Sequence, residues 1–319
     1  MFTMFSTPVI MLPGLLAAFF LTIVFLNIFK DKLPHDQGRA FAVDGALSKG
    51  KARGAGIIFV LVFVVVDLLF NTITVERSIY LADILLCMLT GYFDDASDKP
   101  WNEYLKGFLD FLIAVIIAIT YLTYNGNTYH WSLFTDFTFD IPYWLYGVLI
   151  VILVWVSINV TNCSDGVDGL SATLTVITLG SFYFLNRLDN GVGESNYSIM
   201  LFIIVLVAYL WYNATPSTIL MGDAGSRAMG AMIAISALLC GHALLFIPFA
   251  IVLIFDGGLG LVKIAVTRFL KIPILKNVRC PLHDQARKVN NWSNTQVCYR
   301  FAIIQIVVSV SFVWLYVFG

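Results

Sequence analysis

The sequence predicts an all-α polytopic membrane protein with about ten transmembrane helices and a small outer β-hairpin. Hydrophobic residues make up 59% of the 319-residue chain, and its mean hydropathy is +0.86. Only 12% of the residues are charged, whereas a soluble domain carries about twice that share. Apolar runs long enough to cross a bilayer recur along the whole chain. They lie near residues 8–29, 54–73, 79–93, 108–124, 142–161, 167–186, 197–213, 224–240, 243–266 and 297–318.

The distribution of Lys and Arg predicts the orientation of these spans. All 19 basic residues except Arg77 and Arg187 lie in or beside the connections that follow the odd-numbered runs. Under the positive-inside rule these connections are cytoplasmic and both termini are outside. We therefore expect one integral membrane domain, residues 1–319, with an active site formed by the cytoplasmic loops. These loops are residues 30–53, 94–107, 162–168, 213–224 and 267–296.

The connection at residues 125–141 predicts the outer hairpin. It contains an Asn-Gly pair and alternating aromatic and polar residues, which is the pattern of two short strands joined by a turn. The chain has no internal repeat, so the sequence gives no support to a transporter built from inverted repeats.

The stretch NVTNCSDGVDGL, residues 159–170, is unusually polar for a segment between two apolar runs. Four oxygen-bearing side chains recur there at every third position: Asn159, Asn162, Asp165 and Asp168. At helical spacing they share roughly one face. Gly166 and Gly169 each follow an acid and allow the backbone to bend or to approach a ligand closely. A solvated loop is the plainer alternative, but the pattern favours a polar site at the membrane surface.

Acidic residues cluster in two other connections on the same side. Asp94, Asp95 and Asp98 fall within five residues at the end of an apolar run, where like charges repel one another unless a cation lies between them. Asp223 lies in a Gly-Asp-Ala-Gly segment at the start of another run, where an Asp either caps the helix or binds a metal. A solvated, capped helix end stays open for each, and a shared site for Mg²⁺ or a catalytic base is the functional interpretation.

Basic groups lie on the same side. The segment SKGKARGAG, Ser48–Gly56, interleaves three bases with glycines and is suited to phosphate binding. Lys106 follows the acidic cluster within a helical segment, and His283 lies in the last basic loop, where an imidazole can contact phosphate or carry a proton. Carboxylates, cations and glycines on one face of an apolar protein predict phosphoryl transfer from a metal–diphosphate to a lipid.

Several long motifs occur in one order: GYFDD, NVTNCSDGVDGL, YNATPSTILMGDAGS, and PLH followed by YRFAII. On these motifs, from Ser48 to Phe301, the chain resembles the polyprenyl-phosphate N-acetylhexosamine-1-phosphate transferases. Within that superfamily it is most similar to the phospho-N-acetylmuramoyl-pentapeptide branch. The resemblance implies an Mg²⁺-dependent enzyme of the bacterial cytoplasmic membrane that uses undecaprenyl phosphate and a UDP-sugar, makes lipid I for peptidoglycan, and binds no nucleic acid.

The resemblance also implies roles for individual residues. Asp94 and Asp95 correspond to paired catalytic aspartates, Asp223 to the metal-binding aspartate, and His283 to a histidine of the site. The positions that correspond to substrate-binding ones are Lys49, Lys106, Asn162, Asp165, Asp168, Asn213, Leu220 and Gly222.

Four features differ from the pattern of the muramoyl branch. A triple histidine is His283-Asp284-Gln285 here, and a Thr-Pro-Thr-Met-Gly-Gly loop is only partly matched by Ala52–Gly56. A phenylalanine that would stack on uracil is Leu220, and an expected lysine is Asp98. Asp98 instead matches the branch that uses UDP-N-acetylglucosamine, which stays open as the alternative donor. A transporter and a prenyltransferase with a DDxxD motif are more distant alternatives. A homodimer stays open, and Asp67, Asp83, Asp110 and Asp256, inside apolar runs, receive no role.

Overall fold

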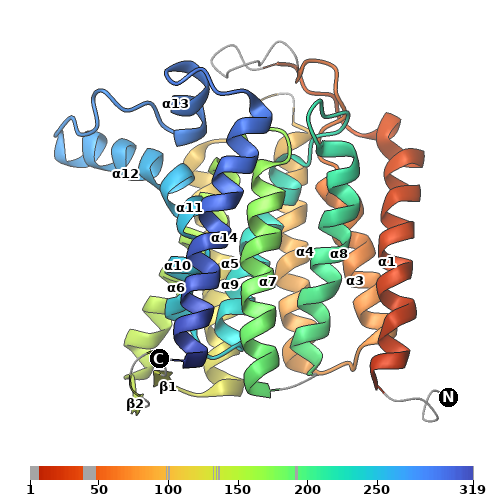
Figure 1. The fold of residues 1–319 in the computed structure, drawn as a ribbon, viewed down its shortest axis with the longest axis vertical. Helices are drawn as coiled ribbons and strands as arrows, with labels where there is room; N and C mark the ends of the chain where they lie inside the picture. The colour runs from red at the N-terminus through yellow and green to blue at the C-terminus, as the bar shows by residue number, and fades with distance from the viewer. Residues whose placement is uncertain are drawn as a thin grey trace.

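The computed structural model describes residues 7–38, 48–97, 99, 101–131, 133, 135, 137–190 and 193–318. Helices occupy all ten predicted runs and stand side by side in one bundle (Figure 1). Nine of these runs are nearly continuous helices: α1 (Thr7–Phe29), α3 (Gly56–Phe70), α4 (Val75–Asp95), α5 (Glu103–Asn125), α6 (Tyr143–Cys163), α7 (Leu170–Asn190), α8 (Glu194–Asn213), α9 (Gly222–Leu239) and α14 (Asn294–Phe318). The predicted all-α class is confirmed.

The ninth run is broken. It begins with α10 (Phe246–Phe249), bends by 70° and continues through α11 (Ile251–Leu253), a π-helical turn at Ile254–Gly258, α12 (Leu259–Ala265) and a second π-helical turn at Val266–Leu270. The segment α12 projects from the bundle (Figure 1), and the short helix α13 (Leu282–Lys288) follows it. We predicted one continuous span here, although Pro248 and the Gly257-Gly258 pair are residues that commonly interrupt helices.

The predicted hairpin is also confirmed. Strands β1 (Thr128–Trp131) and β2 (Phe137–Asp140) pair antiparallel, with Thr128 opposite Asp140. In Figure 1 the hairpin lies at the same end of the bundle as the first turn of α1 and the last turn of α14. The start of the first helix and the end of the last helix therefore lie at the same end of the bundle. This is what an even number of membrane crossings requires.

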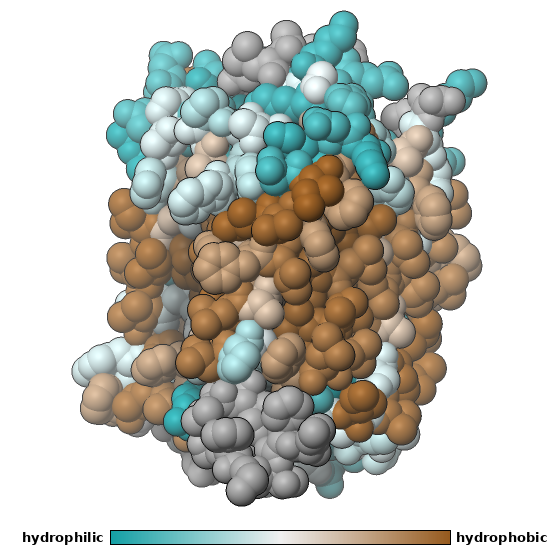
Figure 2. All heavy atoms as spheres, turned by 90° about the vertical axis from the view of Figure 1, so that its right-hand side faces the viewer, coloured by the Kyte–Doolittle hydropathy of each residue, from teal (hydrophilic) through white to brown (hydrophobic). Residues whose placement is uncertain are grey.

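Five of the helices are long and apolar enough to cross a membrane by themselves, and the bent ninth segment makes a sixth if its two arms form one span. They are α1 with its extension to Lys32, α5, α6, α8 and α14. On the face drawn in Figure 2, a band of hydrophobic side chains lies below a hydrophilic cap. This band is the surface that a lipid bilayer would cover.

Helix α9 is less apolar because protein surrounds it. Every residue from Gly222 to Leu238 is buried. Glycines allow its neighbours to approach closely, since a Cβ added at Gly56, Gly91 or Gly230 would overlap the backbone of a facing helix. Small residues at such contacts are typical of helices packed within a membrane.

Charges inside the bundle are mostly paired. The Arg227 guanidinium of α9 contacts the Asp110 carboxylate of α5 through two nitrogens, and Asn159 donates to the same carboxylate at 3.4 Å. Both members of this ion pair are buried. The pair therefore joins α5 to α9, and it gives Asp110 a structural role that the sequence did not indicate.

We predict that Arg227→Met lowers the free energy of unfolding by about 3–5 kcal/mol, because it leaves the Asp110 carboxylate buried without a cation. Thermal unfolding in detergent, followed with a dye that reacts with the buried thiols of Cys87 and Cys240, measures the change. The double variant Arg227→Met/Asp110→Leu restores most of the loss, and Arg187→Met, at an exposed position, serves as the control. Equal melting temperatures for Arg227→Met and wild type would contradict the assignment.

Candidate functional site

Three carboxylates and two cations meet at one end of the bundle. Asp94 and Asp95 end α4, Asp223 lies in the first turn of α9, and Lys106 lies in the first turn of α5. The Lys106 ammonium contacts Asp94 and lies 3.1 Å from Asp223 Oδ2. The Arg53 guanidinium lies 2.8 Å from Asp95 Oδ1 and 3.4 Å from Asp223 Oδ1. The structure therefore brings the predicted acids together in space.

Backbone geometry at the start of α9 positions this cluster. Gly222 has φ +68°, and a Cβ added there would overlap the Asp95 carboxylate. The Ala224 N–H donates to Asp95 Oδ2 at 3.2 Å, so Asp95 accepts from the amino end of α9, where the helix dipole favours a negative charge. The N-cap position is occupied by Met221, without a side-chain cap, so Asp223 does not cap the helix.

The cluster has more acids than bases. Asp36 is a fourth carboxylate, 3.9 Å from Arg53 Nη1. Burial alone would lower the pKa of the Arg53 guanidinium, but the charges of Asp95, Asp223 and Asp36 outweigh burial and raise this pKa above its usual value. The surplus of negative charge leaves the cluster suited to a further cation.

Asp94 is held more tightly than a surface carboxylate. It is buried, and its Oδ1 accepts from the backbone N–H of Trp101 at 2.7 Å. The contact with Lys106 engages its other oxygen. A carboxylate with two fixed donors keeps one orientation, as a catalytic group must.

The segment that carries Arg53 is fixed by hydrogen bonds to the loop before α9. Leu220 N–H donates to the Ala52 carbonyl at 2.8 Å, and Ala55 N–H donates to the Leu220 carbonyl at 3.1 Å. Leu220 therefore contributes its backbone to the site, whatever its side chain contacts. Lys49 is exposed and lines a shallow depression with Lys30, His35 and Lys51. Within this segment the base that reaches the acids is Arg53, which sequence reasoning did not single out.

Two of the predicted substrate-binding residues hold loops together. Asp168 accepts from Ser217 through the backbone N–H at 3.0 Å and through the hydroxyl at 2.8 Å. Asn213 is buried, accepts from Gly169 N–H at 2.8 Å and donates to the Ile219 carbonyl at 2.9 Å. Both residues fasten the 213–221 loop against the start of α7.

Asn162 and Asp165 lie nearer to the acid cluster. Asn162 donates to the Ser226 hydroxyl, in the first turns of α9, at 2.9 Å. Asp165 is half-buried, and its charge acts on Arg53. The polar stretch between α6 and α7 therefore faces the same end of α9 as the aspartates.

His283 is buried and oriented by Asp256. Its backbone N–H donates to Asp256 Oδ1 at 2.7 Å, and its ring Nδ1 lies 2.9 Å from Asp256 Oδ2. A Cβ added at Gly166 would overlap the ring at Nε2, so this edge of the imidazole faces the polar stretch. Asp256 lies in the first π-helical turn, a feature frequent at functional sites. We assigned Asp256 no role from the sequence, although an acid inside an apolar run is a signal for one.

The two residues that replace histidines of the muramoyl pattern brace the last loop. Asp284 Oδ1 accepts from Arg287 Nη2 at 2.8 Å, and Arg287 also donates to the Gly166 carbonyl at 3.1 Å. Gln285 accepts from the Arg279 backbone N–H at 2.8 Å. Asp98, the other position that differs, lies outside the described residues.

Fold and site together define a class of protein: an integral membrane protein with a cluster of carboxylates and cations at one end of a helical bundle. Residues 78–241 match the family model described as glycosyl transferase family 4. The chain belongs to this family.

Curated relatives match over most of their length. The chain is 40% identical to the phospho-N-acetylmuramoyl-pentapeptide-transferase of Treponema pallidum (strain Nichols), over 94% of this chain and 87% of the relative. It is 28% identical to proteins of the same name from Dictyoglomus turgidum, over 92% and 94%, and from Wolbachia pipientis wMel, over 80% and 81%. These relatives agree with the resemblance drawn from the motifs.

We predict that Gly222→Ala lowers the stability of the protein and displaces Asp95. The strained backbone costs about 1–3 kcal/mol, and the added Cβ overlaps the carboxylate. Gly180→Ala in α7 is the matched control, because a Cβ there meets open space and Ala favours helix. Thermal unfolding of both variants measures the difference, and a Gly222→Ala protein as stable as Gly180→Ala would refute the prediction.

Proposed function

We propose that this chain transfers phospho-N-acetylmuramoyl-pentapeptide from its UDP-activated form to undecaprenyl phosphate, giving lipid I and UMP. The observation that carries the proposal is the cluster of Asp94, Asp95 and Asp223 with Arg53 and Lys106 at one end of an apolar bundle. The names of the relatives, matched over most of their length, support phospho-N-acetylmuramoyl-pentapeptide as the transferred group.

The reaction is a displacement at phosphorus. An oxygen of undecaprenyl phosphate attacks the β-phosphorus of the UDP-sugar, the bond from that phosphorus to the bridging oxygen breaks, and UMP leaves with the electron pair. Such transfers depend mainly on positioning and on neutralising phosphate charge. Arg53 and Lys106 are the cations placed to hold phosphate oxygens, because both already bridge carboxylates at the site.

Asp94 is our candidate to keep the attacking lipid phosphate ionised. It is fixed by Trp101 N–H and lies beside Lys106, which would approach the same phosphate. Asp95 is bound by Arg53 and by the amino end of α9, so it acts by positioning the cation and the helix. Direct displacement requires no covalent aspartyl phosphate, and we favour it as the simpler route.

Mg²⁺ is proposed as the cofactor, with Asp223 as its protein ligand. Among the described residues no three His, Cys, Asp or Glu side chains are spaced to enclose a metal ion. Mg²⁺ commonly uses only one or two carboxylates, with water and substrate phosphate completing its shell, so the donor set fits. When bound, the ion would neutralise diphosphate charge. Asp223 would hold the ion, while Arg53 and Lys106 would keep their contacts with Asp95 and Asp94.

The remaining predicted residues would bind the UDP-sugar donor or position the loops around it. Asn162 and Asp165 face the site from the polar stretch, and the Nε2 edge of His283 faces the same stretch. Gly222 allows Asp95 to approach, and Asp168 and Asn213 hold the loop that leads to Asp223. Lys49 stays a prediction as a cation at the rim of the site.

We also propose that the site faces the cytoplasm of a bacterial cell and that both termini lie outside. The basic residues gather at the end of the bundle that holds the site, which favours a cytoplasmic position for that end. The first turn of α1 and the last turn of α14 lie at the opposite end (Figure 1). A homodimer stays a prediction.

The proposal is tested by UMP release from purified protein with undecaprenyl phosphate and Mg²⁺. We expect release with UDP-N-acetylmuramoyl-pentapeptide and none with UDP-N-acetylglucosamine, and loss of release when EDTA removes the metal. Release with UDP-N-acetylglucosamine alone would assign the chain to the other branch. Release with neither donor would refute the proposal.

We predict that Asp223→Asn lowers kcat by about 100-fold or more, because the phosphates lose their metal ligand. Titration calorimetry with Mg²⁺ and the UDP-sugar gives a second readout, in which the variant binds the metal more weakly than wild type. Asp140→Asn, an exposed carboxylate of the hairpin at the other end of the bundle, is the control. An active, folded Asp223→Asn protein with unchanged metal affinity would rule out this ligand.

A further inference from the structure

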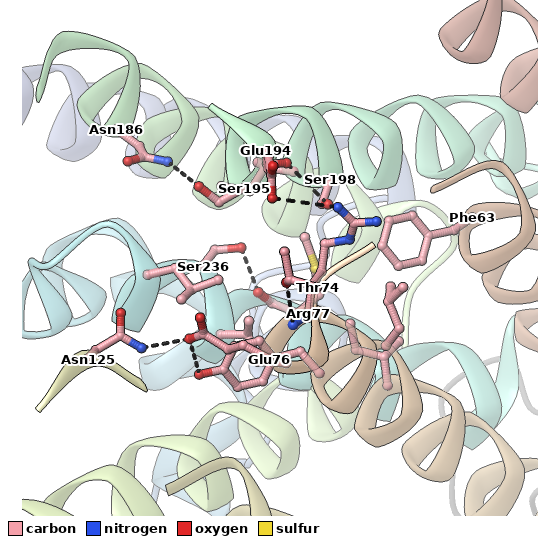
Figure 3. A pocket seen from close by; sticks show the side chains of 17 residues that line it. Phe63, Thr74, Glu76, Arg77, Asn125, Asn186, Glu194, Ser195, Ser198 and Ser236 are labelled. Carbon is pink, nitrogen blue, oxygen red and sulfur yellow. Dashed lines mark hydrogen bonds and ion pairs between the residues drawn. The ribbon is translucent and has the colours of Figure 1, made fainter. Parts of the chain in front are cut away.

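A second polar cavity lies at the end of the bundle opposite the transferase site. It has a volume of about 420 Å³, within the usual range for ligand pockets. Its lining residues come from α3, α4, α5, α7, α8 and α9 (Figure 3). The residues of the site described above lie at the other ends of α4, α5 and α9, so the two sites share helices but no residues.

The lining of this cavity changes from polar to apolar with depth. Glu76 and Glu194 lie in the first turns of α4 and α8, and Asn125 ends α5. Ile84 lies eight residues further along α4, about 12 Å deeper at the rise of an α-helix. Apolar side chains form the floor: Phe63, Leu81, Ile84, Ile199, Met232 and Ile235. The gradient runs along the helices, as the polarity of a lipid does in a bilayer leaflet.

Arg77 is ion-paired, but its N–H groups have no hydrogen-bond acceptor among the described residues. Its Nε lies 3.2 Å from Asp67 Oδ2 and its Nη1 lies 3.8 Å from Glu194 Oε2. None of its three guanidinium nitrogens has a hydrogen-bond partner among the described residues, although all three are buried. Figure 3 shows the side chain reaching across the pocket toward Glu194 and Ser198. Buried charged donors without acceptors are costly, so a ligand with an acceptor group is favoured here.

The two carboxylates at the rim of this cavity favour a ligand that also carries a positive charge. Glu76 Oε1 accepts from Asn125 Nδ2 at 2.6 Å and from Tyr80 Oη at 3.1 Å, whereas Glu194 is exposed and only loosely paired with Arg77. Two carboxylates and one guanidinium line the pocket, so its lining carries a net negative charge. A purely anionic ligand would be repelled.

We propose that this cavity binds an amphiphile whose head carries both a phosphate and a primary ammonium, such as a phospholipid with an ethanolamine head. The phosphate accepts from Arg77, the ammonium donates to Glu194 and Glu76, and the apolar part lies against the floor. This ligand differs from the lipid acceptor of the transferase, which has no ammonium group, and it occupies the other face of the membrane.

The experiment uses full-length protein in detergent and a lysophosphatidylethanolamine with a fluorescent chain, followed by anisotropy. We expect saturable binding to wild type. We then compare four unlabelled competitors and expect lysophosphatidylethanolamine to compete most strongly. Of the other three, lysophosphatidylglycerol lacks the ammonium, lysophosphatidylcholine lacks N–H donors, and free phosphoethanolamine lacks the apolar chain. Equal competition by lysophosphatidylglycerol would overturn the role of the carboxylates. Equal competition by free phosphoethanolamine would overturn the amphiphile in favour of a soluble ligand.

Glu194→Gln is the main variant, because Arg77→Gln would leave the buried Asp67 carboxylate without its cation. We expect about a tenfold weaker affinity, the loss that corresponds to one charge-assisted contact. Ile235→Trp, which fills the floor, is expected to abolish binding with little change in melting temperature. Glu103→Gln, an exposed carboxylate at the transferase end, is the matched control. Unchanged affinity in both Glu194→Gln and Ile235→Trp would refute the pocket as the binding site.

Discussion

The structure depends on the close packing around the first turns of α9. Gly56 and Gly91 bring α3 and α4 against the backbone of Gly225 and Asp223, where any larger residue would overlap. This approach places the Asp95 carboxylate at the N–H of Ala224 and turns Asp223 toward the cations. A charged site can exist here because protein, rather than lipid, surrounds these groups.

The same packing explains why the acids can be so close together. Three carboxylates at hydrogen-bonding distance from shared cations repel one another, and Arg53 and Lys106 offset that repulsion. Both cations come from other elements than the acids that they bridge, so the cluster joins the loop before α3 to α4, α5 and α9. The chemistry and the stability of this end of the bundle therefore rest on the same contacts. The charges inside the bundle do not support the alternative of a transporter, because Asp110 forms an ion pair with Arg227 and Asp67 forms one with Arg77.

Composition was enough to predict the fold class, and the spacing of polar motifs was enough to predict which loops approach one another. What sequence could not supply was the direction of individual side chains. Lys49 and Arg53 belong to one segment of alternating bases and glycines, and only the hydrogen bonds to Leu220 decide which base faces the acids. Asp256 is 27 residues from His283, and the pairing depends on a π-helical turn that a continuous predicted helix does not include. We predicted Asp168 and Asn213 as substrate-binding residues, yet in the structure their side chains form hydrogen bonds with neighbouring loops.

Charged residues inside this bundle differ in how their charge can be accommodated. Arg227 and Asp110 neutralise each other, which makes them part of the scaffold. Asp83 is buried with one oxygen unpartnered among the described residues, but a carboxyl group can bind a proton and become neutral. A guanidinium has no such route, since it stays protonated in proteins. Arg77 is ion-paired with Asp67, but its buried donors have no hydrogen-bond acceptor among the described residues and a cavity lies beside them. It is therefore the interior charge whose retention a bound ligand explains best.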